Sequence, residues 1–342
     1  MDVHVDPLSA VTPALRVQGL SVRFDTDDGP VHAVRSVDLE VGPGELVALL
    51  GESGSGKSVT ARAVLGLAGA GAEVSADVLS VAGTDVLALR PRELRAVRGE
   101  RVSLVMQDAL SALNPVLTVG EQIAEVLRVH RGLGRAAATA RAAELLGLVG
   151  IPAPARRVRD YPHQFSGGMR QRILIAMAIA LEPELLIADE PTTALDGTVQ
   201  AQVLELIDDL RRRLGMAVLL ITHDLGVVME TSDRVAVMYA GRVVETGDTA
   251  EVLSAPKHPY TEALLRSVPS RAGRERLITI PGSPPRPGSV PAGCSFHPRC
   301  RLAADLCRTA RPELVTVGRG RAAACHRSDE LAAEVSRAGA AV

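Results

Sequence analysis

One eight-residue stretch constrains the fold of this chain more than any other feature of its sequence. Residues 51–58 read GESGSGKS, and they stand between an apolar run at Leu46–Leu50 and a helical pattern at residues 58–67. Glycines let the backbone curl so that successive N–H groups point at one anion, and the following helix directs its positive end there too. A flexible linker is the alternative, but a linker needs neither the Lys-Ser ending nor the flanking strand. The stretch therefore predicts a phosphate-binding loop.

Strands and helices alternate on both sides of this loop. Besides Leu46–Leu50, the expected strands lie at residues 15–24, 37–41, 102–106, 185–188 and 217–221, with a hairpin around 240–241. The expected helices lie at residues 91–99, 119–130, 135–148, 168–181, 198–214 and 225–231. Apolar strands separated by helices predict an α/β fold with a mainly parallel sheet covered on both faces.

The bulk composition excludes several classes of function. The formal net charge is -2, so no basic field attracts nucleic acid, and aromatic residues make up only 2% of the chain, which disfavours base stacking. Residues 1–13 lack the pattern of a signal peptide. The longest apolar stretch, residues 173–188, is broken by two glutamates and a proline. We expect a cytoplasmic chain that binds no nucleic acid and reaches a membrane only through partners.

Two carboxylates follow the apolar run at residues 185–188. Asp189 at the end of a buried strand can hold Mg²⁺, and Glu190 can orient and polarise an attacking water. An acidic strand end in solvent is the alternative, but the phosphate loop upstream makes it the weaker one. In the loop itself, Lys57 is expected to reach the β- and γ-phosphates and Ser58 to bind Mg²⁺. The loop residues expected to bind the nucleotide are Gly51, Glu52, Ser53, Gly54, Ser55, Gly56, Lys57, Ser58 and Val59.

Four further motifs surround the acidic pair. Residues 165–172 read FSGGMRQR, in which Ser166 is a candidate helix cap. Gln107 follows an apolar run, Asp196 ends the tripeptide at residues 194–196, and His223 follows another strand. With the loop and the acidic pair, these motifs resemble, in kind and in order, the Q-loop, signature, D-loop and switch histidine of ABC ATPases. The resemblance covers roughly residues 14–250 and implies a P-loop ATPase core.

That resemblance implies a mechanism in which two such domains enclose two ATP molecules head to tail. Glu190, His223 and Gln107 would be catalytic, and Ser58, Gln107 and Asp189 would hold Mg²⁺ beside Lys57. The residues implied to contact the partner's ATP are Ser166, Gly167 and Gly168, and Asp196 belongs to the D-loop. Phe24 stands where the family stacks an aromatic ring on adenine. A core residue on the first strand is the equal alternative for Phe24.

Two downstream segments narrow the kind of transporter. Residues 256–261 read PKHPYT and residues 294–300 read CSFHPRC, and both resemble the C-terminal extension of oligopeptide, dipeptide and nickel importer ATPases. The resemblance implies a peripheral protein at the cytoplasmic face of the membrane that energises peptide import. Its implied partners are a homologous ATPase in a heterodimer, two membrane permeases and an extracytoplasmic binding protein. Import of nickel or another small solute is the alternative, and a soluble ABC ATPase of repair or translation is a more distant one.

The resemblance and a change in composition after about residue 255 divide the chain into parts. We expect an N-terminal arm at residues 1–13 and an ABC ATPase domain at 14–255, which includes a helical subdomain at about 108–165. A separate cysteine-rich module follows at residues 256–330, and a tail at 331–342.

All four cysteines lie in that last module, at Cys294, Cys300, Cys307 and Cys325. Structural disulfides are rare in a cytosolic chain, so four thiols in one module suggest a metal site. Zinc prefers closer pairs than this C-x5-C-x6-C-x17-C spacing, whereas iron–sulfur ligands vary more in spacing. Resemblance to importer ATPases with a C-terminal [4Fe–4S] cluster favours iron. Zinc and free buried thiols stay open as alternatives.

Overall fold

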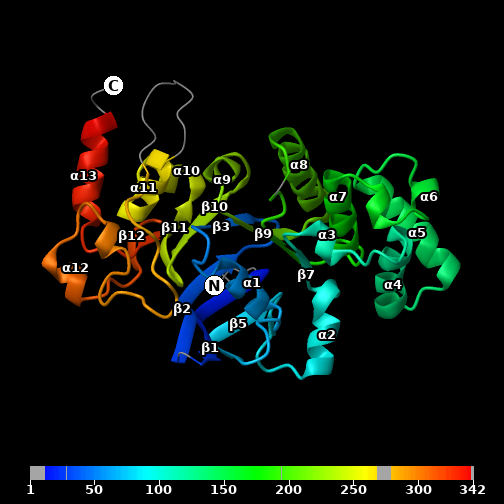
Figure 1. Ribbon diagram of the computed structural model, residues 1–342, viewed down its shortest axis with the longest axis horizontal. Helices are drawn as coiled ribbons and strands as arrows, with labels where there is room; N and C mark the ends of the chain where they lie inside the picture. Colours follow the sequence, from blue (N-terminus) through cyan, green and yellow to red (C-terminus); the bar gives the residue numbers. More distant parts are fainter. Residues whose placement is uncertain (1–11, 28, 194, 268–278, 340–342) are drawn as a thin grey trace, which may run out of the picture.

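The computed structural model describes residues 12–27, 29–193, 195–267 and 279–339, and it builds them around two β-sheets (Figure 1). The strands of the larger sheet are β3 (Leu46–Leu50), β7 (Val102–Val105), β8 (Leu185–Asp189), β9 (Ala217–Thr222), β10 (Arg234–Tyr239), β11 (Arg242–Asp248), β12 (Val315–Gly318) and β13 (Arg321–Ala323). Their order across the sheet is β12-β13-β11-β10-β3-β9-β8-β7. The strands from β10 to β7 pair in parallel, whereas β11, β13 and β12 pair antiparallel.

The centre of this sheet is buried on both faces, as its continuous apolar runs predict. Every residue of β3, β8 and β9 is buried. Along β8, Leu186 packs with the helical side of the molecule, and Ile187 packs with the second sheet. Because the strands run in parallel, the loops that follow β3, β7, β8 and β9 meet at one edge of the sheet, where ligands bind in open α/β folds.

The smaller sheet is antiparallel and lies below the larger one in Figure 1. Its strands are β1 (Leu15–Thr26), β2 (Gly29–Val41), β4 (Ala72–Ser75), β5 (Val78–Val81) and β6 (Thr84–Asp85). Helix α1 (Lys57–Val64) contacts both sheets, and its apolar residues join their shared core. Strand β2 begins eight residues before the expected residue 37. The sequence did not reveal this first half, because most of its residues are exposed or half-buried and form no apolar run.

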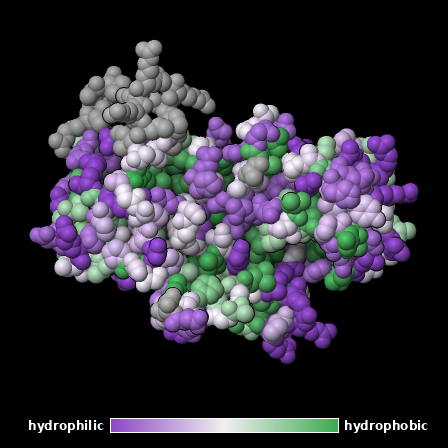
Figure 2. All heavy atoms as spheres, viewed as in Figure 1, coloured by the Kyte–Doolittle hydropathy of each residue, from purple (hydrophilic) through white to green (hydrophobic). Residues whose placement is uncertain are grey.

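Helices cover the sheets, and one group of them forms a separate lobe, at the right of Figure 1. The lobe contains α3 (Ala109–Ala112), α4 (Val119–Arg131), α5 (Arg135–Leu148) and α6 (Pro154–Arg157). Thr118 caps α4 by accepting a hydrogen bond from the Glu121 backbone N–H, and Gly132 ends the helix with a φ of 66°. On the face shown in Figure 2, apolar residues are exposed among charged ones over this lobe.

The remaining helices surround the larger sheet. They are α2 (Pro91–Glu100), α7 (Gly167–Ala178), α8 (Gly197–Leu214), α9 (Leu225–Thr231), α10 (Thr249–Ser254), α11 (Pro259–Ser267), α12 (Asp305–Thr309) and α13 (Ser328–Gly339), with 3₁₀ turns η1 (Pro162–Gln164) and η2 (His297–Arg299). The predicted helices are confirmed, with ends that differ from the predicted ones by at most three residues. None of the helices in the described ranges is long and apolar enough to cross a membrane.

The C-terminal region is joined to the core of the molecule by strand pairing and by apolar packing. Strand β13 pairs with β11, so the larger sheet continues into this region. Tyr239, Tyr260 and Phe296 pack together, with the two tyrosine rings 4.6 Å apart and the Tyr239 and Phe296 rings 5.3 Å apart. These rings are half of the six Tyr and Phe residues in the chain. They lie far apart in the sequence, so no local pattern revealed their cluster.

Candidate nucleotide site

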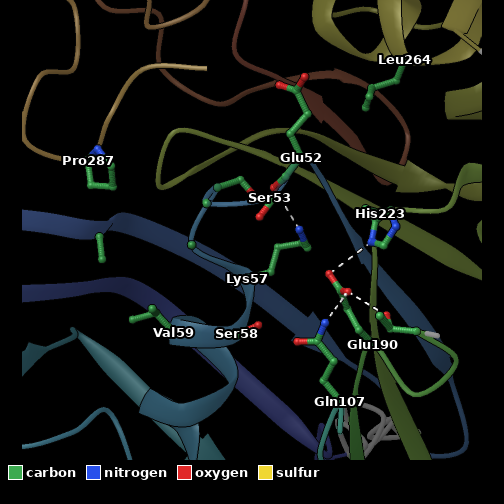
Figure 3. Close-up of a pocket in the computed structure, with 15 residues that line it drawn as sticks. Glu52, Ser53, Lys57, Ser58, Val59, Gln107, Glu190, His223, Leu264 and Pro287 are labelled. Atoms are coloured by element: carbon green, nitrogen blue, oxygen red, sulfur yellow. Dashed lines mark hydrogen bonds and ion pairs between the residues drawn. The ribbon is translucent and has the colours of Figure 1, made fainter. Parts of the chain in front are cut away.

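A cavity of about 680 Å³ opens at the edge where the parallel strands end, which is large enough for a nucleotide (Figure 3). Its lining residues are Ala33, Glu52, Ser53, Gly54, Ser55, Gly56, Lys57, Ser58, Val59, Gln107, Glu190, Thr193, His223, Leu264 and Pro287. The structure thus brings together most of the residues predicted from the phosphate loop, the Q-loop, the acidic pair and the switch histidine.

The phosphate loop packs too tightly for side chains at two of its glycines. A Cβ at Gly51 would lie 2.2 Å from the Met238 carbonyl oxygen. Gly56 has a φ of 107°, and a Cβ there would lie 2.6 Å from the Ala33 carbonyl oxygen. The neighbouring strands therefore hold the loop backbone in place, and its first helical turn begins directly at Lys57.

Lys57 is buried inside this loop. Its Nζ donates hydrogen bonds to the carbonyl oxygens of Gly51, at 2.6 Å, and Glu52, at 3.0 Å. Burial lowers the pKa of the Lys57 ammonium, while the carboxylates of Glu190, Asp189 and Glu52 oppose that shift. The Ser55 hydroxyl oxygen is buried here without a hydrogen-bond partner among the described residues. A cation and an unpaired hydroxyl in a backbone cradle fit the phosphates of a nucleotide.

Beside the lysine, two oxygen ligands suited to Mg²⁺ lie in contact. The Ser58 hydroxyl donates a hydrogen bond of 2.8 Å to Asp189 Oδ1. Burial raises the pKa of the Asp189 carboxyl, and the hydrogen bond from Ser58 partly offsets that shift. Hydroxyl and carboxylate oxygens at the phosphates are the donor set that Mg²⁺ takes in nucleotide sites. The donor set therefore fits the ion, and the role of Gln107 as a third ligand stays a prediction.

Glu190 is the centre of a hydrogen-bond network. Gln107 donates to Glu190 Oε2 at 3.2 Å, Thr193 donates to the same oxygen at 2.9 Å, and His223 Nδ1 lies 3.2 Å from Oε1 (Figure 3). Glu190 also has a φ of 47°, a strained conformation for a residue with a side chain. Three elements therefore orient one carboxylate. No sequence motif marked Thr193, although it stands only three residues after Glu190.

The signature and D-loop residues lie outside this cavity. Ser166 caps α7 by accepting a hydrogen bond from the Met169 N–H, and Asp196 caps α8 by accepting one from the Val199 N–H. A Cβ on Gly168 would lie 2.4 Å from a Val199 methyl carbon, so the two helix starts pack together. Ser166 and Gly167 are exposed, and Ala194 of the D-loop lies outside the described residues. This chain does not bring its own signature motif to its own phosphate loop.

Phe24 lies on β1, where it pairs with Val31 and Ala72 of the neighbouring strands and packs against the core between the sheets. It does not line the cavity, so its contact with adenine stays a prediction. Leu264 and Pro287 line the cavity instead. No sequence signal marked these two residues, because they lie more than 200 positions beyond the phosphate loop.

The four cysteines gather around a second, much smaller cavity. It is lined by Cys294, Cys300, Cys307 and Cys325 together with His258, Pro259, Phe296, His297, Leu302, His326 and Arg327. All four are free thiols, and Cys294 N–H donates to the Cys307 carbonyl oxygen at 2.8 Å. Burial raises the pKa of the Cys300 and Cys325 thiols to about 11, and neighbouring thiols add to the shift. Among the described residues, no group of three or more His, Cys, Asp or Glu is arranged to hold a metal ion.

Comparison with known proteins defines the class of the fold and site. A family model described as ABC transporter matches residues 34–193. The solved dimeric, post-hydrolysis ATP-binding cassette MJ0796 bound to ADP and Pi is 27% identical, with a TM-score of 0.59 over 69% of this chain and 98% of that chain. The cbiO1 structure from Clostridium perfringens is also 27% identical, with a TM-score of 0.60 over 70% of this chain and 90% of that chain. The chain has the fold of an ABC ATPase.

Relatives of higher sequence identity show which family of ABC ATPases the chain belongs to. The dipeptide transport ATP-binding protein DppD of Escherichia coli (strain K12) is 48% identical over 313 residues, which are 91% of this chain and 96% of the relative. The oligopeptide transport ATP-binding protein OppD of Mycobacterium tuberculosis is 51% identical over 93% of this chain, and this chain spans about half of that relative, 52%. The model described as Oligopeptide/dipeptide transporter, C-terminal region, matches residues 244–307. This chain belongs to the ABC transporter ATP-binding proteins of the oligopeptide/dipeptide family.

Proposed function

We propose that this chain binds and hydrolyses ATP and that the hydrolysis energises import of di- or oligopeptides. One observation carries the proposal: a single cavity holds the buried Lys57 ammonium, the Ser58 hydroxyl and the oriented Glu190 carboxylate. The relatives DppD and OppD, a dipeptide and an oligopeptide transport ATP-binding protein, support the cargo class. Import of nickel or another small solute by the same kind of ATPase is the alternative.

Each residue of the cavity has a distinct part in this reaction. Lys57 and the loop N–H groups bind the phosphates, and Ser58 with Asp189 would hold Mg²⁺, which neutralises charge on the transferred phosphoryl group. Glu190 orients the attacking water and accepts its proton. His223 and Gln107 hold the Glu190 carboxylate in position, and Gln107 also links the site to the helical lobe that follows it in the chain.

The nucleotide part of the proposal is tested at Lys57. Lys57→Ala removes the buried cation, and we expect ATP affinity to fall by about tenfold or more, because hydrogen bonds to charged groups contribute about 1.5–3 kcal/mol. Isothermal titration of ATP into the full chain measures this change. Lys257→Ala, an exchange of the same type outside the cavity, is the control. Equal ATP affinity in the wild type and Lys57→Ala would count against the assignment.

The second part of the proposal is a head-to-tail pair of ATPase subunits. Ser166 and Gly167 are exposed at the start of α7 and outside their own cavity, which suits contact with ATP on a partner. The dimeric structure of the MJ0796 cassette supports such a pair. We propose a homologous ATPase as the partner, with Ser166, Gly167 and Gly168 at the γ-phosphate of its site.

Ser166→Arg tests this arrangement. In the complex with the partner ATPase, we expect hydrolysis at the partner's site to fall, because a bulky cation replaces the small helix cap. ATP binding at this chain's own Lys57 should stay close to that of the wild type. Hydrolysis is measured in a complex in which only the partner's site is functional. Ser254→Arg on α10 is the control. Loss of ATP binding at this chain's own loop would refute the head-to-tail model.

We further propose that the helical lobe docks on membrane partners. Leu110 and Val116 are 65% and 75% exposed in the segment that follows Gln107, and apolar residues in that place suit a cytoplasmic helix of a permease. Two permeases and an extracytoplasmic binding protein complete the proposed transporter, with this chain as a peripheral protein at the cytoplasmic face of the membrane. Within it, residues 14–255 would form the ATPase domain, and residues 256–330 the extension.

We also propose that the four cysteines bind a [4Fe–4S] cluster, with zinc as the alternative. Four free thiols from separate segments line one cavity, and Cys₄ ligation is the usual coordination of such a cluster. Protein purified without oxygen should be brown and contain about four irons per chain. Cys300→Ser should bleach the colour, and Ser295→Ala in the same loop should not. Zinc in place of iron would favour the alternative, and no metal would reject both.

A further inference from the structure

The second residue of the phosphate loop is held by the C-terminal region. Figure 3 shows the Glu52 carboxylate turned away from the Lys57 ammonium and out of the phosphate cradle. It receives two parallel hydrogen bonds from the Arg299 guanidinium, of 2.7 Å to Oε2 and 3.0 Å to Oε1. Tyr260 accepts a hydrogen bond of 2.9 Å from the Glu52 backbone N–H. Residues 208 and 247 positions away thus fix both the backbone and the side chain of Glu52.

Arg299 is itself rigidly placed. Its side chain is only 5% exposed, and its Nε donates to the Pro281 carbonyl oxygen at 2.9 Å. One guanidinium nitrogen also donates to the Tyr239 hydroxyl at 3.3 Å, and the guanidinium lies 5.9 Å from the Phe296 ring centre. A planar guanidinium held on several sides presents a fixed fork to a carboxylate, which a lysine does not reproduce.

The charge of Glu52 gives this contact a consequence for nucleotide binding. Glu52 lies one residue after Gly51 in the loop, and its carbonyl oxygen accepts a hydrogen bond from Lys57 Nζ. An unpaired carboxylate here would repel a triphosphate, and low local dielectric strengthens that repulsion. Turned back, it would also compete for the Lys57 ammonium, whose pKa burial lowers and the nearby carboxylates, Glu52 among them, partly restore.

We propose that Arg299 is a positioning residue of the nucleotide site, which neutralises Glu52 and holds the phosphate loop open for ATP. The inference rests on the proposed ATP site and goes beyond it, because it assigns the C-terminal region a part in setting nucleotide affinity. Arg299 belongs to η2, between Cys294 and Cys300, so it links the wall of the cysteine cavity to the phosphate loop. Leu264 and Pro287, which line the ATP cavity, approach it from the same region.

Three variants of the full chain test the proposal by ATP titration and steady-state hydrolysis. Arg299→Met removes the guanidinium and leaves Glu52 charged and unpaired. ATP affinity should therefore fall about tenfold, a change within the usual range of interaction free energies between contacting residues. The KM for ATP should rise in proportion while kcat changes little, because Arg299 does not touch the reacting atoms. The double variant Arg299→Met/Glu52→Gln should regain most of the lost affinity, since it removes the unpaired negative charge. Arg299→Lys should fall between the wild type and Arg299→Met.

The matched control is Arg301→Met. Arg301 lies two residues further along and pairs with Glu262 and Glu334, away from the loop, so its loss should leave ATP affinity unchanged. Should Arg299→Met fail to fold, Arg299→Lys with and without Glu52→Gln gives the same comparison. Unchanged affinity in the Arg299 variants, or equal loss in the single and double variants, would overturn the inference. A wild-type chain that binds no ATP would instead overturn the proposed function.

Discussion

Replacing Glu190 by Gln should stop ATP turnover while ATP still binds. The carboxylate accepts hydrogen bonds from Gln107 and Thr193 and lies 3.2 Å from His223 Nδ1, so it is held where a water-orienting base is needed. An amide cannot accept the proton of the water, and loss of a positioned base typically lowers the rate by roughly 10²–10⁴-fold. Phosphate release from the full chain in complex with its partner ATPase, with the partner's own site inactivated, measures the effect.

The control for this experiment is Glu205→Gln, on an exposed position of α8. It makes the same chemical change outside the cavity and should hydrolyse ATP at the wild-type rate. ATP titration should give similar affinities for the wild type and Glu190→Gln, because Lys57 and the loop are intact. Normal turnover by Glu190→Gln at its own site would refute the catalytic role of Glu190.

Replacing Arg321 by Met should destabilise the fold strongly. Glu245 is fully buried on β11, and its Oε1 accepts a hydrogen bond of 2.7 Å from Arg321 on β13. The backbone N–H groups of Lys257 and His258 donate to the same carboxylate, and Arg321 also donates to the Ala255 carbonyl oxygen. Loss of Arg321 leaves a buried negative charge without its cation. Breaking such a pair costs roughly 3–5 kcal/mol in the free energy of unfolding.

Denaturant unfolding followed by circular dichroism measures this change. Arg308→Met is the control, because Arg308 and Asp305 are exposed and 4.0 Å apart, and exposed pairs contribute at most about 1 kcal/mol. The double variant Arg321→Met/Glu245→Gln should recover part of the loss, since it removes the unpaired charge. Equal stability of Arg321→Met and Arg308→Met would show that the buried pair does not hold β13 to the core.

The motifs predicted most of the nucleotide site because each stands directly after a strand of one parallel sheet. Lys57 follows β3, Gln107 follows β7, Glu190 follows β8 and His223 follows β9, so the topology alone brings them together. The apolar runs and the helices between them predicted a mainly parallel sheet, and the structure supplies the order of its strands. Spacing within each motif, and its place after a strand of a parallel sheet, were therefore enough to predict these residues.

The features that could not be predicted from the sequence depend on contacts between segments far apart in the chain. Arg299 and Glu52 form a hydrogen bond although they are 247 residues apart, and no local sequence pattern at either position indicates the other. The cluster of Tyr239, Tyr260 and Phe296 likewise joins three segments that are separated along the chain. Residues that are far apart in the chain pack through tertiary structure, which periodicity does not record.

Uptake of a labelled peptide tests the central claim most directly. Cells that carry Glu190→Gln in their chromosomal copy are compared with wild-type cells and with cells that carry the Glu205→Gln control, at equal amounts of the protein. We predict that uptake of labelled di- or oligopeptides is lost in the Glu190→Gln cells alone. Unchanged peptide uptake in those cells would contradict the account, and loss of nickel uptake in its place would assign the ATPase to the alternative cargo.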